Sequence, residues 1–445
     1  MTERDVAQGL LDRAARIPGT EAEVLYKRSE SSRITCRARS LEDVMSSVSM
    51  GIGLRLLRDR RLGFSYTSDL SENGVKGLFA RALQLLEVAE TDEHHAFAGP
   101  QPSPCADDLL THDPALPPTP EKLADIARAA EESALAVPGV TKTMGAGAAF
   151  GQTSMLLLNS KGVDVSTSYT VSSVSASAIA ERDGKMEVAS SGSQHHYHSK
   201  AYSPEKVGRE AGEWAAAQLG GEPIKTGQMP VVFDPRVASM LVMYLDGVLD
   251  GERVLLGTSY LVGKLGRQVA SPLFTLVEDP HTPGLIESSA LDGEGNPTSP
   301  KKVIDEGVLT TYFYHIYSAN KAGAKPTGNA VRPSFAGPPV AGAYNLHVAA
   351  GDKTPDDIIG EVEYGYFVRS IMGHGPDPVT GNVSLGSSGF LIENGKVTRP
   401  VSRVTIAGNV LDILAGIDAV GSDLDLIRPY FSPTLRVKAL TVSGT

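Results

Sequence analysis

The chain has 445 residues, of which 41% are hydrophobic and only 6% aromatic, so it can build two or three domains around an aliphatic core. Its formal net charge of −11 argues against a nucleic-acid partner and against docking on an anionic membrane, because both require a basic face. Two cysteines, Cys36 and Cys105, are too few for a disulfide scaffold, and neither has a base nearby in the sequence that would support a catalytic thiol.

The first 19 residues predict an amphipathic helix with Thr2 as its N-cap. This segment has no apolar core of the kind found in signal peptides. The longest apolar run, residues 240–245, is too short to span a bilayer. We therefore expect a cytoplasmic protein. The side of this helix that we expect to be buried carries Val6, Leu10, Leu11, Ala14 and Ile17.

The rest of the N-terminal half alternates between strand and helix patterns. It predicts strands at 22–29, 32–37 and 44–55, a hairpin over 54–66, and helices at 73–90, 121–136 and 204–219, with an exposed connector at 91–120 and alternating strands over 140–190. Both strand regions end in a hairpin with a charged turn, near Asp59 and near Asp183, which indicates a weak internal duplication. The Gly-Gly-Glu-Pro stretch at 220–223 is the best domain boundary.

The second half opens with a strand at 229–233 and a helix that begins at Asp234 as N-cap, followed by proline. We expect Asp246 and Asp250 on the solvent side of this helix and Gly251 at its C-cap. Many short strands follow, and Asn394 with Gly395 predicts a type I′ hairpin turn. The expected buried stripe of the helix is Val237, Met240, Leu241, Tyr244 and Val248. The fold class is α+β with two domains: residues 1–222, with sheets and packed helices, and residues 223–445, rich in strands.

Motifs that carry hydrolytic chemistry are missing. The sequence contains no His-Glu-x-x-His helix, and residues 386–389 (GSSG) have the wrong spacing for a serine nucleophile elbow, so we predict a turn there. His196 and His198 would share one face of a strand, but a solvated loop or strand end is the favoured interpretation over a metal site. Acidic residues around 278–294, with His281, form two oxygen-rich loops that would gather around a cation only occasionally.

The second half resembles the TldD/PmbA peptidase family, on its PmbA (TldE) side. The resemblance is dense from residue 231 to 423 and weaker in the N-terminal half. The segments that carry it are 277–284 (VEDPHTPG), 291–295 (LDGEG), 306–309 (EGVL), 317–321 (YSANK), 326–329 (PTGN), 371–375 (IMGHG), 377–381 (DPVTG), 386–390 (GSSGF) and 405–409 (TIAGN).

The resemblance implies an α+β chain that pairs with a second, related chain, as a heterodimer with a TldD-type zinc subunit or as a homodimer. In the TldD subunit a helix carries His-Glu-x-x-x-His, and a cysteine near the C-terminus completes the zinc site. Here Met243, Tyr244 and Val248 stand at the matching helix positions, and no cysteine follows Cys105. The resemblance therefore implies a metal-free subunit, without catalytic residues, whose partner holds zinc.

The implied task is to help that partner cut unfolded peptides, among them precursors of peptide antibiotics and an antitoxin, which is the origin of the family's description as modulators of DNA gyrase. Candidate peptide-binding or cleft residues are His281, Asp292, Glu294, Asn329 and His374. Two alternatives remain: an atypical or metal-independent hydrolase that acts as a homodimer, and a peptide-binding scaffold protein.

Overall fold

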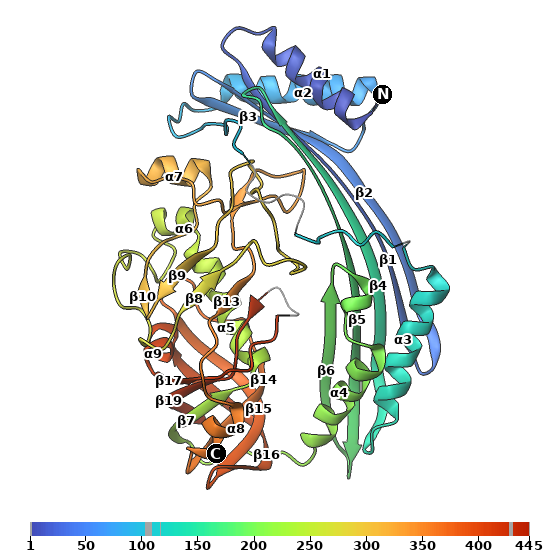
Figure 1. Cartoon of the computed structure of the whole chain (residues 1–445), viewed down its shortest axis with the longest axis vertical. Helices are drawn as coiled ribbons and strands as arrows, with labels where there is room; N and C mark the ends of the chain where they lie inside the picture. Colours follow the sequence, from blue (N-terminus) through green and yellow to red (C-terminus); the bar gives the residue numbers. More distant parts are fainter. Residues whose placement is uncertain (1, 103–108, 116, 427–429, 445) are drawn as a thin grey trace.

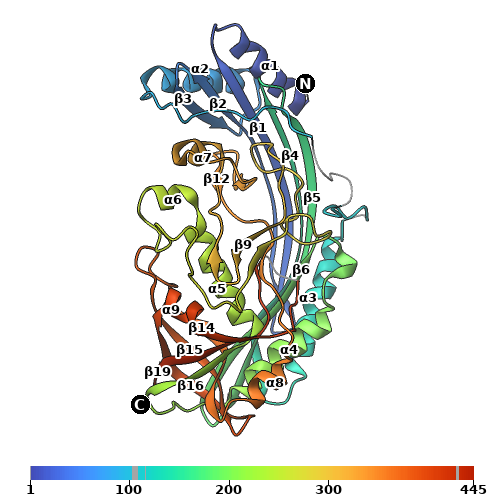
Figure 2. The ribbon, with the colours of Figure 1, turned by 60° about the vertical axis from the view of Figure 1, so that its left-hand side comes forward.

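The molecule consists of a long curved sheet and a strand-rich body that lies on the concave side of the sheet (Figure 1). The structure, a computed structural model, describes residues 2–102, 109–115, 117–426 and 430–444; Cys105 and its predicted place in the connector lie outside these residues. The N-terminal half forms the sheet and its four helices, and the C-terminal half lies within the concave side of the sheet (Figure 2). No helix in the described part of the chain has the length and apolar character needed to cross a membrane.

The long sheet is antiparallel, with six strands in the order β3-β2-β1-β4-β5-β6. Its central strands are unusually long because β1 pairs with β2 on one side and with β4 on the other along nearly its whole length. These two ladders carry β1 through the polar residues where the sequence predicts a break between two strands. The strands are β1 (Glu21–Arg37), β2 (Ser40–Arg58), β3 (Arg61–Thr67), β4 (Val140–Asn159), β5 (Asp164–Arg182) and β6 (Lys185–His195).

Two helices cover each end of this sheet. At one end α1 (Glu3–Ala15) and α2 (Glu72–Val88) pack on β1, β2 and β3, and at the other α3 (Pro120–Leu135) and α4 (Pro204–Ala217) pack on β4, β5 and β6. The predicted cap of α1 is confirmed, because Thr2 and Asp5 form a reciprocal capping box.

The same element order occurs twice, as helix, three antiparallel strands and helix, and the two copies meet at β1 and β4. Both charged turns fall where the pattern places them, with positive φ at Asp59 (49°) and at Asp183 (53°). The structure thus carries the internal likeness that the two hairpins indicate.

The C-terminal half is built on a second six-stranded sheet in the order β16-β15-β14-β7-β19-β17, in which β16 also pairs with β19 and closes five strands into a ring. A smaller sheet, β10-β9-β8-β13-β18, and the helix α5 (Pro235–Leu249) pack against it around one aliphatic core. The strands are β7 (Gly227–Phe233), β8 (Leu276–Glu278), β9 (Lys301–Asp305), β10 (Val308–Leu309), β11 (Ala330–Val331), β12 (Val340–Ala341), β13 (Leu346–Val348), β14 (Tyr364–Met372), β15 (Asn382–Glu393), β16 (Lys396–Asn409), β17 (Ile417–Val420), β18 (Tyr430–Phe431) and β19 (Leu435–Ser443).

Short helices connect these strands: η1 (His198–Lys200), α6 (Gly251–Leu255), α7 (Ile316–Ala322), α8 (Pro355–Gly360) and α9 (Val410–Ala415). The predicted hairpin at Asn394 and Gly395 is confirmed, since both residues have positive φ between β15 and β16. The predicted turn at 386–389 is wrong, because these residues lie inside β15. Gly389 is needed there for close packing, since an added Cβ would come within 1.9 Å of the carbonyl oxygen of Phe367 on β14.

Three details of α5 differ from its predicted pattern. Asp250, rather than Gly251, ends the helix, and Gly251 instead begins α6 with Asp250 as its N-cap. Met240 and Tyr244 are only half-buried, whereas the structure also buries Leu245 and Leu249. Asp246 does not face solvent, because β18 and the segment after β12 cover it. A helix that packs against other elements on two sides buries more than one stripe of residues. The helical spacing of hydrophobic residues in the sequence predicts only one such stripe.

Candidate functional site

A buried network of ion pairs joins the long sheet to the C-terminal half. Glu23 on β1 accepts two hydrogen bonds from Arg55 on β2, each of 2.8 Å, and also pairs with Arg332. Arg55 reaches further to Glu294, at 3.2 Å. Four side chains from four separate segments of the sequence therefore neutralise one another where little solvent reaches them.

The charges in this network compensate for a large loss of hydration. Burial disfavours the charged form of Glu23, but Arg332 and Arg55 outweigh it and hold the pKa of this carboxyl below its usual value. Burial likewise opposes the charge on Arg55, and Glu23 and Glu294 raise its pKa. Burial lowers the pKa of Arg332 despite its contact with Glu23. The network joins the two halves of the chain through buried ion pairs, because Glu23 and Arg55 belong to the N-terminal half and Glu294 and Arg332 to the C-terminal half.

The two acidic loops lie together, as the sequence suggests, but their carboxylates do not converge on one point. Glu278 is fully buried and binds Lys301, Asn329 and the backbone N–H of Tyr344. Asp279 accepts from the N–H of His281. Each acid has its own donor, so nothing here requires a cation. Among the described residues, no three His, Cys, Asp or Glu side chains gather in an arrangement that would hold a metal ion.

Asp292 and Glu294 cap their own loop. Asp292 accepts backbone N–H bonds from Glu294, Asn296 and Ala330, and Glu294 accepts one from Ile316 at the start of α7. Burial, with the nearby charge of Glu294, raises the pKa of Asp292 to about 7 even though these N–H groups oppose the shift. Both side chains are almost completely inaccessible.

The other candidate cleft residues differ in accessibility. Asn329 is fully buried between Glu278 and the carbonyl oxygen of Gly342. His281 is half-buried, with its Nε2 atom 3.0 Å from the hydroxyl of Thr298. His374 is exposed in the loop after β14. The structure therefore brings Asp292, Glu294 and Asn329 together and leaves His374 apart from them.

The α5 positions that the resemblance aligns with zinc ligands do not share one face. The Met243 side chain is 39% exposed, whereas Val248 is only 4% exposed and belongs to the core. Tyr244 lies between them, half-buried, with its ring close to Gly375 in the loop that carries His374. Burial raises the pKa of its hydroxyl.

His196 is not the solvated residue that its sequence context predicts. It is 1% exposed, and its ring lies between the carbonyl oxygens of Thr170 on β5 (Nδ1–O, 2.6 Å) and Leu285 in the C-terminal half (Nε2–O, 3.0 Å). Burial lowers the pKa of the ring, although the facing carbonyls favour its charged form. A hydrogen-bonded core histidine at the interface between the two halves explains its position.

A second polar cluster, which the sequence did not reveal, consists of Asp246 on α5, Lys27 on β1 and Glu287, whose charge interacts with both. Asp246 accepts from the hydroxyl of Tyr430 (2.7 Å) and the N–H of Ala343 (3.0 Å), and burial raises its pKa. Burial, followed by the charge of Asp246, raises the pKa of Glu287 to about 7. Burial lowers the pKa of Lys27, whose ammonium group donates to the carbonyls of residues 332 and 333.

These shifts predict how stability depends on pH. The pKa of Glu287 is higher in the folded chain than in an unfolded one, so the folded state binds more protons between about pH 4.5 and 7. The contribution of Glu287 to the free energy of unfolding should therefore fall as pH rises through this range. Protein atoms crowd the Glu287 carboxyl and raise its pKa, but the residue as a whole keeps solvent-accessible surface, and solvent screens its charge. We therefore expect the variant Glu287→Gln to flatten the slope by less than about 1 kcal/mol per pH unit.

Urea unfolding of Glu287→Gln and wild type at pH 5, 6 and 7 measures this difference directly. Glu363→Gln, at an exposed carboxylate on the edge of the C-terminal half, is the matched control and should run parallel to wild type. A constant difference between Glu287→Gln and wild type across the three pH values would contradict the prediction.

The fold defines the class of protein: a mixed α+β chain in which a long antiparallel sheet joins a strand-rich C-terminal half. Three family models match it, described as PmbA/TldA metallopeptidase domain 1 (residues 22–86), central domain (113–219) and C-terminal domain (226–444). The chain belongs to the PmbA/TldD metallopeptidase family.

Individual relatives span most of the chain. Metalloprotease PmbA of Escherichia coli O157:H7 is 29% identical over 413 residues, covering 91% of this chain and 88% of the relative. A metalloprotease PmbA homolog of Haemophilus influenzae is 26% identical over 437 residues, covering 96% and 93%. A metalloprotease TldD homolog of the same organism is 24% identical over 448 residues, covering 95% and 93%.

Solved structures share the whole fold. The crystal structure of a putative modulator of a DNA gyrase from Thermotoga maritima aligns with a TM-score of 0.91 at 25% identity, covering 99% of this chain and 100% of that one. TldE from Thermococcus kodakarensis aligns with a TM-score of 0.86 at 21% identity, with the same coverage, and this likeness supports the fold alone.

Proposed function

We propose that this chain is the non-catalytic, PmbA (TldE)-type subunit of a two-chain zinc peptidase that processes or degrades unfolded peptides. One observation carries the proposal: the helix that the resemblance aligns with the zinc-binding helix is intact, yet Met243, Tyr244 and Val248 occupy its ligand positions, and Val248 points into the core. A thioether, a phenol and a buried alkyl group do not form the His and carboxylate set that catalytic zinc uses. The zinc therefore belongs to a related partner chain.

The exposed half of β2 supports a partner surface. β3 pairs with β2 only from Ile52 to Arg58, so residues 40–50 form an outer edge without a strand partner in the described chain. This edge carries five exposed apolar side chains, and proteins usually cover or charge such an edge. We propose that the zinc-bearing chain covers it. The side chains are Leu41, Val44, Met45, Val48 and Met50, each 38–61% exposed.

Peptide contacts belong to the same proposal. An extended peptide binds a sheet edge through main-chain hydrogen bonds, which tolerates many sequences. Among the candidate cleft residues, Asp292, Glu294 and Asn329 are bound by other groups of this chain, so His374 and the half-buried His281 are the ones with side-chain surface for a substrate. A peptide with a photo-crosslinker should label this chain within the complex. Labelling of the zinc partner alone would contradict the contact.

Co-expression with the TldD-type chain of the same host tests the pairing. We expect the two chains to co-purify, zinc to be bound at one ion per pair, and peptide hydrolysis to require both chains and to stop on addition of a chelator. The chain alone should be inactive. Chelator-resistant hydrolysis by the chain alone, at the rate of the complex, would favour the alternative of a metal-independent homodimeric hydrolase.

Charged substitutions in the β2 edge sharpen that test. The double variant Val44→Lys/Val48→Lys should abolish co-purification and hydrolysis while leaving the melting temperature of the isolated chain unchanged, because both side chains are exposed there. Leu85→Lys, on the exposed side of α2, is the matched control and should leave the complex intact. Normal assembly of the double variant would show that the partner docks elsewhere.

A further inference from the structure

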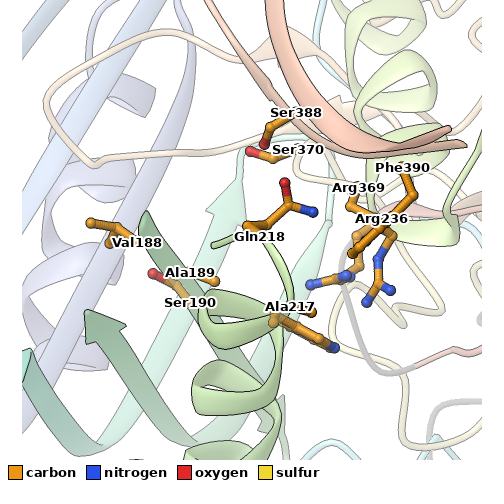
Figure 3. A pocket seen from close by; sticks show the side chains of 11 residues that line it. Val188, Ala189, Ser190, Ala217, Gln218, Arg236, Arg369, Ser370, Ser388 and Phe390 are labelled. Atoms are coloured by element: carbon orange, nitrogen blue, oxygen red, sulfur yellow. The ribbon is translucent and has the colours of Figure 1, made fainter. Parts of the chain in front are cut away.

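A small cavity lies between the two halves of the chain, at the end of the long sheet that carries α4 (Figure 3). Its volume is about 260 Å³, which suits a ligand of the size of one or two amino acids. β6 and α4 form one wall, and the start of α5 with β14 and β15 forms the other. The side chains that matter for its chemistry are Trp214, Gln218, Arg236, Arg369, Ser388 and Phe390.

The cavity carries an excess positive charge. Arg236 binds both oxygens of Asp234, at 2.9 and 3.3 Å, and the Nε atom of Arg369 lies 2.9 Å from the same carboxylate. Two guanidinium groups thus share one acid. Glu210, which also lies near Arg369, accepts a hydrogen bond from Ser191 and pairs with Lys206. One positive charge remains for an anionic group.

A hydrogen-bond acceptor in the same wall lacks a donor. Gln218 is 7% exposed, and its Nε2 atom donates to the carbonyl of Gly389 at 3.3 Å. Its Oε1 atom is buried and accepts no hydrogen bond from any described residue. A buried amide oxygen in this state is costly unless a ligand or water donates to it. The cavity therefore offers a site for an N–H or O–H group beside its site for an anion.

The remaining walls suit an extended backbone with an apolar side chain. β6 is the last strand of its sheet, and residues 188–190 line the cavity in succession. In an antiparallel edge strand, alternate residues point their N–H and C=O groups away from the neighbouring strand. Trp214, on which Arg236 stacks at 3.3 Å from the ring centroid, and Phe390 supply aromatic surface.

We propose that this cavity binds the α-carboxylate of an apolar amino acid, presented as the C-terminal residue of an extended peptide. The carboxylate lies at Arg369 and Arg236, the last backbone N–H donates to Oε1 of Gln218, and the apolar side chain contacts Trp214. The two guanidinium groups match the negative charge of the peptide's C-terminal carboxylate, and the adjacent acceptor matches its last backbone N–H donor. This goes beyond the proposed function, since the isolated chain binds the peptide without its partner.

Trp214 is the only tryptophan of the chain, so its fluorescence reports on the cavity directly. We would titrate the purified full chain with acetyl-Ala-Ala-Leu as the free acid and as the C-terminal amide. The free acid should give a saturable change, and the amide should bind at least about tenfold more weakly because it lacks the charge. Equal binding of acid and amide, or no saturable change up to the solubility limit of the acid, would overturn the proposal.

Two variants and one further ligand locate the contact. Arg369→Gln should weaken binding of the free acid by about tenfold or more, while Arg399→Gln, at an exposed arginine on β16, should leave it unchanged. An equal effect of both variants would contradict the site. If Arg369→Gln lowers the melting temperature, the difference in binding between the free acid and the amide on the wild-type chain still tests the proposal. Free leucine distinguishes the source: binding as tight as that of the peptide would assign the carboxylate site to the free amino acid.

Discussion

Replacing Arg332 by methionine should lower the free energy of unfolding by about 3–5 kcal/mol, which is the cost of breaking a buried ion pair by removal of one partner. The variant leaves Glu23 and Glu294 with a single guanidinium group, that of Arg55. It also removes the hydrogen bond from Nε of Arg332 to the carbonyl oxygen of Gly293 (2.8 Å). Because the side chain is only 2% exposed, water cannot replace these partners.

Urea unfolding followed by circular dichroism measures the loss. Arg399→Met is the matched control at an exposed arginine and should change stability by less than about 0.5 kcal/mol. The double variant Glu23→Gln/Arg332→Met removes one charge of each sign, so it should recover part of the loss. If Arg332→Met unfolds within about 1 kcal/mol of wild type, the network does not hold the two halves together.

Replacing Gly208 by alanine should destabilise the chain by about 1–3 kcal/mol, although alanine is the better helix former. Gly208 lies on α4 where it crosses α3, and an added Cβ would come within 2.0 Å of the carbonyl oxygen of Ala130 and 3.0 Å of the backbone nitrogen of Ala134. These are backbone atoms of a helix, so the methyl group fits only if α3 and α4 move apart. Their separation would loosen the alanine-rich core beneath both helices.

Gly9→Ala in α1 is the matched control, because an added Cβ there meets no atom within 4 Å. Helix propensity alone then acts, and the variant should be more stable than wild type by up to about 1 kcal/mol. Thermal unfolding of the two variants should give opposite signs. Stabilisation by Gly208→Ala would show that the two helices have room to separate without cost.

Local patterns predicted most of the helices and the turns that end the hairpins. Thr2 signals its capping box, and Asn394 with Gly395 signals its turn, because both depend on the residues within one turn of the chain. A prediction from local residue types is wrong at residues 386–389, which form part of a strand and not a turn. Glycine and serine are typical of a turn, yet here Gly389 lets β14 pass close to β15, a contact between segments about twenty residues apart.

The candidate cleft residues divide in the same way. Asp292, Glu294 and Asn329 lie in glycine-rich loops, and the sequence proposes them as peptide-binding or cleft residues, whereas the structure buries all three and binds them to other groups of this chain. The sequence does not show that Arg55, 239 positions from Glu294, is the partner of one of them. The sequence does contain a signal for a buried ion pair, because Arg55 lies within an apolar strand and a buried charge requires a counter-charge.

By itself the sequence determined the α+β class, the order of the long sheet's helices and strands, and the family to which the chain belongs, because these depend on periodicity and on short motifs. Only the tertiary structure decided which charged groups are neutralised in the interior, that Val248 is buried while Met243 stays exposed, and that two arginines meet Gln218 in one cavity. Electrostatic and packing energies depend on distances between segments remote in the chain, and no local pattern encodes those distances.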